Sequence, residues 1–177
     1  MFPLAEPKKK NEWVEWGKAI FIAILLALFL KVFVFATSIV EGESMVPTLE
    51  DGERVIINKF VYLFGEPKRG DIVIIKRPDK NYVKRVIALP GETVEMEEHQ
   101  LYINGKKLNK SFVSKDAANH TGSFGPIQVP DDSYFVMGDN RAISMDSRNG
   151  LGFINRDTII GKSAFVIYPF DEWKKTK

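Results

Sequence analysis

An apolar run near the N-terminus constrains the fold of this chain more than any other feature. Residues 19–36 contain a single charged side chain, Lys31, and as an α-helix they would rise about 27 Å, close to the hydrocarbon thickness of a bilayer. Two tryptophans and four lysines precede the run and favour a cytoplasmic N-terminus. They are Trp13, Trp16, Lys8, Lys9, Lys10 and Lys18. The sequence therefore predicts a cytoplasmic tail at 1–17, one transmembrane anchor helix at 18–38 and an extracytoplasmic domain at 39–177.

A cleavable signal peptide is the alternative for the same region. It would consist of the basic start, the apolar core 19–30 and a small-residue cleavage site at Val34-Phe35-Ala36. The retained anchor is favoured because the whole apolar stretch is longer than such a core needs to be. Both alternatives place the rest of the chain on the outer side of the membrane.

Composition excludes several classes of function. The chain has 177 residues, a net charge of +2 and no cysteine, which suits one moderate domain with an appendage. The basic residues are scattered, so no nucleic-acid partner is expected. Without cysteine there are no disulfides or thiol nucleophiles, and two histidines, His99 and His120, are too few for a histidine-rich metal site. Neither a metal nor a cofactor is expected.

Signals for β-strands dominate from residue 51 onward. Four stretches are rich in Val, Ile, Phe and Tyr: 54–64, 71–78, 82–89 and 163–169. Shorter stretches at 93–96 and 101–103 flank an expected hairpin tip, and Asn104-Gly105 offers a two-residue turn. The polar, glycine-containing segment 110–126 is expected to be a long loop. The sequence therefore predicts a mainly β fold, with one β-rich domain on a single N-terminal helix.

One serine lies in a turn-rich stretch shortly after the apolar run. Residues 41–53 read EGESMVPTLEDGE, in which Gly42, Pro47 and Gly52 indicate turns. Ser44 is either ordinary loop polarity or a nucleophile. A serine hydroxyl is a weak nucleophile and needs an adjacent base. His99 is expected at the hairpin tip and His120 in the long loop, where both would be solvated, so a Ser-His-Asp triad has little support.

Lysine is the other candidate for a base. Within YVKRVIAL, Lys84 shares a strand face with Tyr82, Val86 and Ala88, whereas the opposite face carries Arg85. Burial on an apolar face would disfavour the charged ammonium and so produce a base. From periodicity alone, an edge-strand lysine with its amine in water is the better explanation. The pattern by itself does not decide between the two.

Four separated stretches together resemble the conserved boxes of bacterial type I signal peptidases. They are SMVPTL at 44–49, RGDIV at 69–73, YVKRVIALPGE at 82–92 and GDNRAISMDSR at 138–148. Each box alone is modest, but their order, their spacing and their position behind an expected anchor make the resemblance specific. The single anchor and the compact size resemble the Gram-positive branch of the family.

The resemblance implies a serine endopeptidase with a Ser-Lys dyad on the family's β-rich fold. Ser44 matches the nucleophile, Lys84 the general base, and Ser144 the serine that orients the lysine amine. Asp146 and Arg148 match an ion pair that supports that wall of the site. An unperturbed lysine is neutral in only about one molecule in a thousand near pH 7.4, so such a base requires a lowered pKa.

Two positions depart from the family pattern. Gly42 stands where many members carry a serine whose hydroxyl helps to form the oxyanion hole. The backbone N–H of Ser44 would remain as one donor, and the second donor is left open. Ile143 stands where asparagine is usual, so any contact of that side chain is lost. Neither position belongs to the dyad.

The resemblance also implies substrates, partners and location. The substrates would be secretory preproteins that emerge from the translocase and are cut, through an acyl-enzyme, after small residues at positions −1 and −3. The chain would cross the cell membrane once, with its catalytic domain outside and in contact with the lipid bilayer. The positions assigned to the substrate pocket are Val40, Met45, Leu49, Tyr82 and Val83. Met45 is expected either to dip into lipid or to pack inside the domain.

Two other functions remain open at this point. A self-cleaving repressor shares the Ser-Lys chemistry, but the expected anchor and the lack of a helical DNA-binding segment argue against it. An anchored β-rich adhesion or scaffold domain would need no lysine beside Ser44. The distance from Ser44 Oγ to Lys84 Nζ distinguishes these functions, because a dyad requires hydrogen-bond reach.

Overall fold

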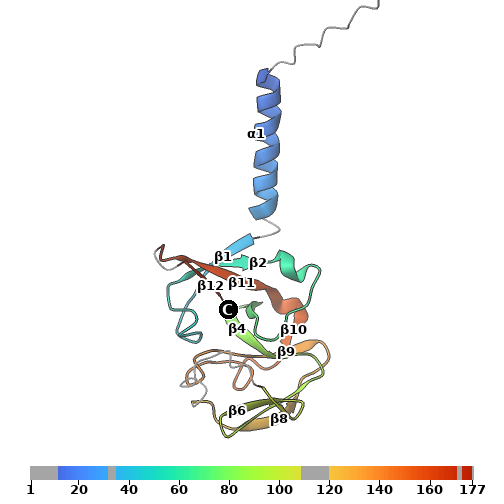
Figure 1. Ribbon diagram of the computed structural model, residues 1–177, viewed down its shortest axis with the longest axis vertical. Helices are drawn as coiled ribbons and strands as arrows, with labels where there is room; N and C mark the ends of the chain where they lie inside the picture. Colours follow the sequence, from blue (N-terminus) through green and yellow to red (C-terminus); the bar gives the residue numbers. More distant parts are fainter. Residues whose placement is uncertain (1–11, 32–34, 109–119, 171–172, 177) are drawn as a thin grey trace, which may run out of the picture. The chain divides into compact units, whose positions relative to one another are not determined.

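The computed structural model describes residues 12–31, 35–108, 120–170 and 173–176, and the chain divides into two compact units at Val34/Phe35 (Figure 1). The first unit contains α1 (Glu12–Phe29), an 18-residue helix with no buried residue. Within the described ranges, no helix combines the length and the apolarity that crossing a membrane requires. The predicted anchor helix is therefore not confirmed.

The last part of the apolar run forms a strand instead of continuing a helix. Strand β1 (Phe35–Ile39) pairs antiparallel with β2 (Arg54–Asn58), so that Phe35 lies opposite Asn58 and Ile39 opposite Arg54. The predicted helix range 18–38 is thus wrong for residues 35–38. Aromatic and β-branched residues fit a pleated sheet as well as they fit an apolar helix, and hydropathy does not separate the two.

An eight-stranded antiparallel sheet forms most of the second unit. Its order is β1-β2-β11-β3-β4-β9-β10, with β12 paired to β11. The other members are β3 (Ile72–Lys76), β4 (Asn81–Ala88), β9 (Ser133–Met137), β10 (Ile154–Asn155), β11 (Ile159–Tyr168) and β12 (Lys174–Lys175). Strand β4 therefore lies inside the sheet, between β3 and β9. The predicted strand at 54–64 stops at Asn58, and a 3-10 turn, η2 (Phe60–Tyr62), follows it.

A four-stranded sheet in the order β7-β6-β5-β8 completes the domain, and Figure 1 shows β6 and β8 apart from the larger sheet. Its strands are β5 (Thr93–Glu97), β6 (Gln100–Ile103), β7 (Lys106–Lys107) and β8 (Phe124–Gln128). The predicted hairpin and the Asn104-Gly105 turn are confirmed, and both turn residues have positive φ. The loop predicted at 110–126 is wrong for 124–126, which belong to β8, and its part at 110–119 lies outside the described residues.

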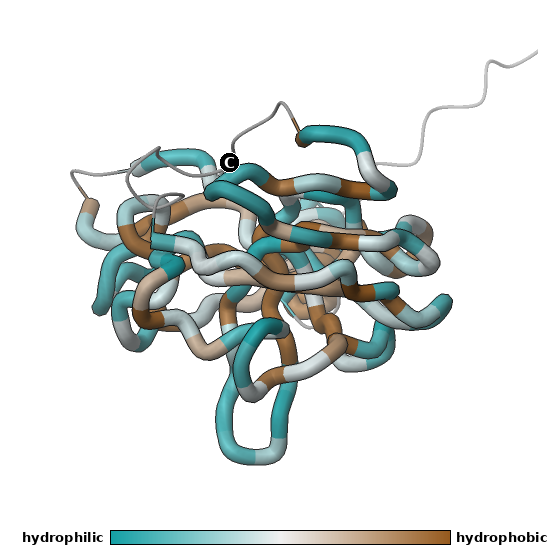
Figure 2. Tube along the Cα trace, turned by 90° about the horizontal axis from the view of Figure 1, so that it is seen from below, coloured by the Kyte–Doolittle hydropathy of each residue, from teal (hydrophilic) through white to brown (hydrophobic). Residues whose placement is uncertain are grey.

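Apolar side chains fill the space around the central strands, and Figure 2 shows hydrophobic stretches running through the middle of the domain with hydrophilic loops around them. One buried cluster joins the loop after β1 to the main sheet. Its members are Val40, Met45, Leu49, Val55, Ile72 and Val166. This cluster fixes the segment that contains Ser44 onto the sheet.

Candidate active site

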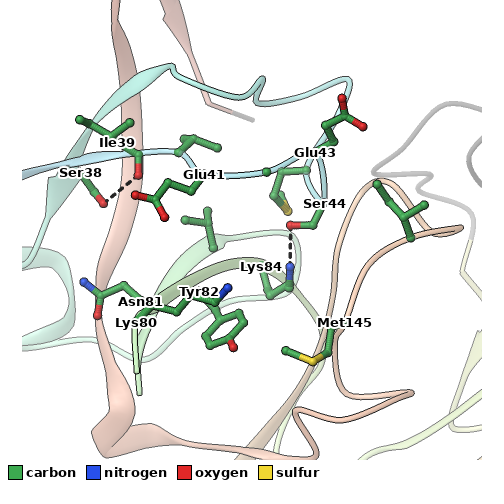
Figure 3. Close-up of a pocket in the computed structure, with 15 residues that line it drawn as sticks. Ser38, Ile39, Glu41, Glu43, Ser44, Lys80, Asn81, Tyr82, Lys84 and Met145 are labelled. Carbon is green, nitrogen blue, oxygen red and sulfur yellow. Dashed lines mark hydrogen bonds between the residues drawn. The ribbon is translucent and has the colours of Figure 1, made fainter. Parts of the chain in front are cut away.

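The loop that carries Ser44 connects β1 to β2 and is anchored by its own apolar residues. Val40, Met45 and Leu49 are buried, and the N–H groups of Thr48 and Leu49 donate to the Met45 carbonyl (2.9 and 3.0 Å). Met45 therefore packs inside the domain, and the alternative that it dips into lipid is wrong. Ser44 itself lines a groove of about 380 Å³ (Figure 3).

Strand β4 brings Lys84 against Ser44. Lys84 Nζ lies 2.6 Å from Ser44 Oγ, and the lysine is only 3% exposed (Figure 3). The interpretation of Lys84 as a lysine with its amine in water is wrong, because its side chain is buried and its amine contacts the Ser44 hydroxyl. The distance meets the requirement of a dyad, whereas a scaffold domain would have no need of a lysine at this place.

The surroundings of the Lys84 amine favour its neutral form. Burial lowers the pKa of Lys84 from 10.5 to about 8. Asp146 and Asp139 oppose this shift, whereas Lys80 and Arg148 add to it. At pH 7 about one amine in ten is then neutral, against about one in three thousand at the unshifted pKa. The site thus contains a base of suitable strength next to a serine hydroxyl.

Gly138 lies where the Ser44 loop meets the 138–148 segment. A Cβ at this position would lie 2.2 Å from Ser144 Oγ and 2.4 Å from the Ser44 carbonyl oxygen. Only glycine permits this approach of two chain segments. Ser144 is 1% exposed, and its hydroxyl has no hydrogen-bond partner in the part of the chain that the structure describes. It helps to lower the pKa of the nearby Asp146 carboxyl. No hydrogen bond joins it to the Lys84 amine, so the orienting role of Ser144 stays a prediction.

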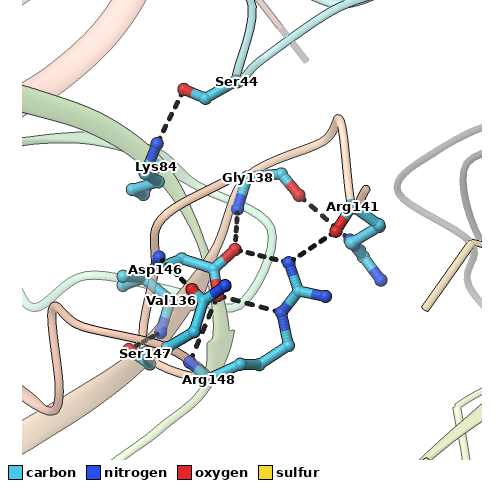
Figure 4. Close-up of polar contacts among 9 residues, drawn as sticks. Ser44, Lys84, Val136, Gly138, Arg141, Asp146, Ser147 and Arg148 are labelled. Carbon is cyan, nitrogen blue, oxygen red and sulfur yellow. Dashed lines mark hydrogen bonds and ion pairs between the residues drawn. The ribbon is translucent and has the colours of Figure 1, made fainter. Parts of the chain in front are cut away.

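Asp146 and Arg148 form an ion pair in which Asp146 is buried and Arg148 half-buried. Arg148 donates from Nε to Asp146 Oδ1 (2.9 Å) and from Nη2 to Oδ2 (2.8 Å), and the Gly138 N–H also donates to Oδ2 (2.9 Å; Figure 4). Burial alone would raise the pKa of the Asp146 carboxyl, but the hydrogen bonds from Arg148 and Gly138 outweigh it and leave the pKa lowered. The charged carboxylate therefore holds Gly138 in place beside the Ser44 loop.

A second ion pair, with both partners buried, lies between Arg85 and Asp139, and the sequence features above do not predict it. Arg85 donates from Nε and Nη2 to the two Asp139 oxygens (2.8 and 2.6 Å), and both residues are at most 1% exposed. The Thr48 hydroxyl donates to Asp139 Oδ2 (2.5 Å), and the Asn140 N–H donates to the Ser44 carbonyl (3.0 Å). The pair thus ties the Ser44 loop to the 138–148 segment. An arginine within an apolar strand is the signal that indicates such a buried carboxylate.

Gly42 has a conformational role in the Ser44 loop. Its φ is +83°, in a region that residues with side chains rarely adopt. Its N–H donates to Asp51 Oδ1 (2.6 Å) and is therefore occupied. The Ser44 N–H forms no hydrogen bond within the described ranges. One backbone donor next to the Ser44 hydroxyl thus remains available.

The groove is lined by most of the predicted pocket residues and by several others. Val40, Met45, Tyr82 and Val83 line it, whereas Leu49 is 0% exposed and lies in the core. The additional lining residues relevant below are Ile143 and Met145. Both histidines are exposed and outside the groove, and His99 lies at the hairpin tip as predicted. Among the described residues, no cluster of His, Cys, Asp and Glu is suited to bind a metal ion.

A buried amine of lowered pKa, within hydrogen-bond reach of a loop serine in an open groove, is an arrangement that serine hydrolases use. Comparisons with known proteins agree with this class. Residues 13–168 match the family model described as signal peptidase, peptidase S26. The chain is 55% identical to signal peptidase I T of Bacillus subtilis (strain 168), over 96% of this chain and 93% of that protein. It is 53% identical to signal peptidase I of Bacillus licheniformis, over 95% of each.

Among solved structures, a signal peptidase I from Enterococcus faecalis V583 is 37% identical, with 55% of this chain and 97% of that chain covered and a TM-score of 0.48. From the family model and the two Bacillus relatives, the chain belongs to the S26 family of signal peptidases, and it is a serine endopeptidase. The resemblance to bacterial type I signal peptidases is thereby confirmed, and the repressor and scaffold functions are not supported.

Proposed function

We propose that this chain removes N-terminal signal peptides from secretory preproteins through a Ser44–Lys84 dyad. The observation that carries the proposal is the 2.6 Å separation of Ser44 Oγ from a buried Lys84 amine whose pKa is lowered to about 8. The match to S26 signal peptidases supports the substrate class.

The proposed reaction is an acyl transfer. Neutral Lys84 accepts the proton of the Ser44 hydroxyl while Oγ attacks the carbonyl carbon of the scissile peptide bond. The Ser44 N–H, which has no hydrogen-bond partner in the part of the chain that the structure describes, donates to the oxyanion that develops on the carbonyl oxygen. Lys84 then returns the proton to the leaving amine, and the mature protein departs. Water deprotonated by Lys84 attacks the ester, restores Ser44 and releases the signal peptide.

The edge of β4 beside the groove suits an extended substrate. The N–H and carbonyl of Val86 both bond toward the β3 side, so by alternation those of Val83 point the other way. Strand β9 pairs with β4 only from Arg85 to Ala88. The Val83 backbone is thus placed to pair with an extended signal-peptide segment by strand addition. Apolar walls from Val40 and Val83 favour small residues at −1 and −3.

The proposal includes a place of action at the outer surface of the cell membrane, near the protein translocase. The apolar sequence at 19–36, which includes residues outside the described ranges, motivates the proposed single-pass anchor. Cell fractionation checks this part: recovery of the full chain in the aqueous fraction, without membranes, would refute it.

Cleavage of a preprotein by the purified full-length chain in detergent tests the dyad. Ser44→Ala and Lys84→Ala are each expected to lower kcat by roughly four orders of magnitude, because members of such a unit act together. In the wild type, activity should fall as the pH drops below about 8, since Lys84 then takes up a proton. Retained activity in either folded variant, or a flat profile down to about pH 5, would rule out the amine base.

A further inference from the structure

Two exposed apolar side chains line the groove without any role in the proposed chemistry. Ile143 is 60% exposed and Met145 44% exposed, and both line the groove that contains Ser44 and Lys84. Ser144 and Asp146, which alternate with them, are at most 1% exposed. This alternation directs the two apolar side chains away from the interior of the domain and toward the groove. They form an apolar pair within reach of whatever occupies the site.

Met145 has a defined seat next to Gly150. A Cβ on Gly150 would lie 3.1 Å from Met145 Cγ and 3.3 Å from Met145 Sδ, so the methionine lies against the bare face of the glycine. The φ of Gly150 is +113°, which also favours glycine there. The thioether chain is adaptable and fits side chains of different shapes. Met145 thus offers an apolar surface that is supported from behind.

The position of Met145 along the groove relates it to one side of the scissile bond. Figure 3 shows Met145 beyond the Ser44–Lys84 pair as seen from Ser38 and Ile39. In the proposed function, the side of the groove near Val83 receives the residues before the scissile bond. The leaving amine therefore departs on the opposite side of Ser44, together with the first residue of the mature protein.

We infer that Ile143 and Met145 form an apolar subsite for the side chain of residue +1, the first residue after the scissile bond. This inference rests on the proposed function and adds a substrate preference to it. An aliphatic +1 side chain loses its contact with water against Ile143 and Met145, whereas a polar one of equal size leaves its amide without partners there. The chain therefore favours aliphatic residues at +1.

Peptide cleavage by the full-length chain in detergent tests the subsite. Two peptides carry Ala at −3 and −1 and differ only at +1, which is Leu in one and Asn in the other, two side chains of similar shape. The wild type is expected to show a kcat/KM about tenfold higher for the Leu peptide. Ile143→Asn and Met145→Ala should each reduce this ratio to about twofold. Leu63→Asn is the matched control, because Leu63 is 62% exposed and lies outside the groove, and it should keep the tenfold ratio.

The outcomes separate the subsite from the proposed function. A wild-type ratio near one with normal cleavage after Ala overturns the subsite and leaves the proposed function standing. A loss of preference in Leu63→Asn, as expected of a general micelle or membrane contact, also overturns it. So does a change of tolerance at −1 instead of +1 in the Ile143 or Met145 variants. If the wild type cleaves neither peptide, both the proposed function and the subsite are overturned.

Discussion

The two faces of strand β4 bury neighbouring cations in opposite ways. Arg85 is 1% exposed and is neutralised by the Asp139 carboxylate through two hydrogen bonds. Lys84 is 3% exposed, and the one hydrogen-bond partner of its amine within the described residues is the Ser44 hydroxyl. Arginine keeps its proton under almost all conditions, so its burial requires a counter-charge. Lysine can instead release its proton, and its lowered pKa shows that burial has this effect here.

The difference shows that one face of β4 supports the Ser44 loop through Arg85, while the other carries the proposed base, Lys84. The Arg85–Asp139 pair reaches the Ser44 loop through Thr48 and so holds the hydroxyl opposite the amine. Among the described residues, no carboxylate forms an ion pair with Lys84, and Asp146 is paired with Arg148. A carboxylate paired directly with Lys84 would raise its pKa and abolish the base.

Removing Arg85, the cation that is paired with Asp139, should have the largest effect on stability. Arg85→Met leaves Asp139 buried without its ion-pair partner and is expected to lower the free energy of unfolding by about 3–5 kcal/mol. Urea unfolding of the purified chain measures this change. Arg54→Met, at an exposed position of β2, is the control and should stay within about 0.5 kcal/mol. A loss of similar size in both variants would contradict the distinction.

Removing Lys84, the cation next to Ser44, should instead raise the free energy of unfolding. Because the folded chain holds the pKa of Lys84 near 8 instead of 10.5, the folded state binds fewer protons than the unfolded state between these values. Lys84→Met is therefore expected to stabilise the domain by roughly 3 kcal/mol below pH 8, while it abolishes cleavage.

This gain should shrink as the pH rises from 8 to 10.5, where the unfolded lysine also becomes neutral. Thermal or urea unfolding at pH 7 and at high pH measures it. Lys76→Met, on the exposed end of β3, provides the control and should show no such pH dependence. A Lys84→Met variant that is less stable than the wild type at pH 7 would show that burial of the Lys84 amine does not destabilise the folded chain.

The smallest expected effect is that of the Lys80 charge on the pKa of Lys84. Lys80 is exposed, lines the groove and contributes to lowering the pKa of Lys84. Lys80→Gln should therefore shift the acid limb of the pH–rate profile slightly to higher pH. The shift should diminish in high salt, because ions screen exposed charges. A shift to lower pH, or an equal one in Lys76→Gln, would mean that Lys80 acts in another way.

Local sequence patterns predict much of this fold, because residue type and spacing indicate strands and turns wherever the neighbours in the sequence determine the structure. The strands around 72–76 and 82–88, the hairpin at 93–103 and the Asn104-Gly105 turn follow from residue type and spacing. Strand β1 does not, since the sequence FATSI continues an apolar run that suits a helix as well. Strand β8 includes Gly125 and Pro126, which indicate a loop, yet the pairing with β5 overrides them.

The geometry of the site depends on contacts that no local pattern contains. Periodicity places Lys84 and Arg85 on opposite faces, but their burial depends on segments distant in the sequence, namely the Ser44 loop against Lys84 and Asp139 against Arg85. The family resemblance selects Ser44, Lys84, Asp146 and Arg148 as candidates. It does not reveal that Leu49 is in the core, that the Ser144 hydroxyl is buried, or that Asp139 supports the Ser44 loop.

The close approach at Gly138 also has a consequence for the order in which the domain folds. The bond from Thr48 to Asp139 joins residues 91 positions apart, and the contact of Ser44 with Lys84 joins residues 40 positions apart. Contacts that close such long loops carry a large entropic cost and tend to form late. A newly made chain would therefore fold its hairpins first and acquire its hydroxyl–amine pair last. The chain would then lack its hydroxyl–amine pair, and with it the activity proposed for the dyad, until the large sheet had closed.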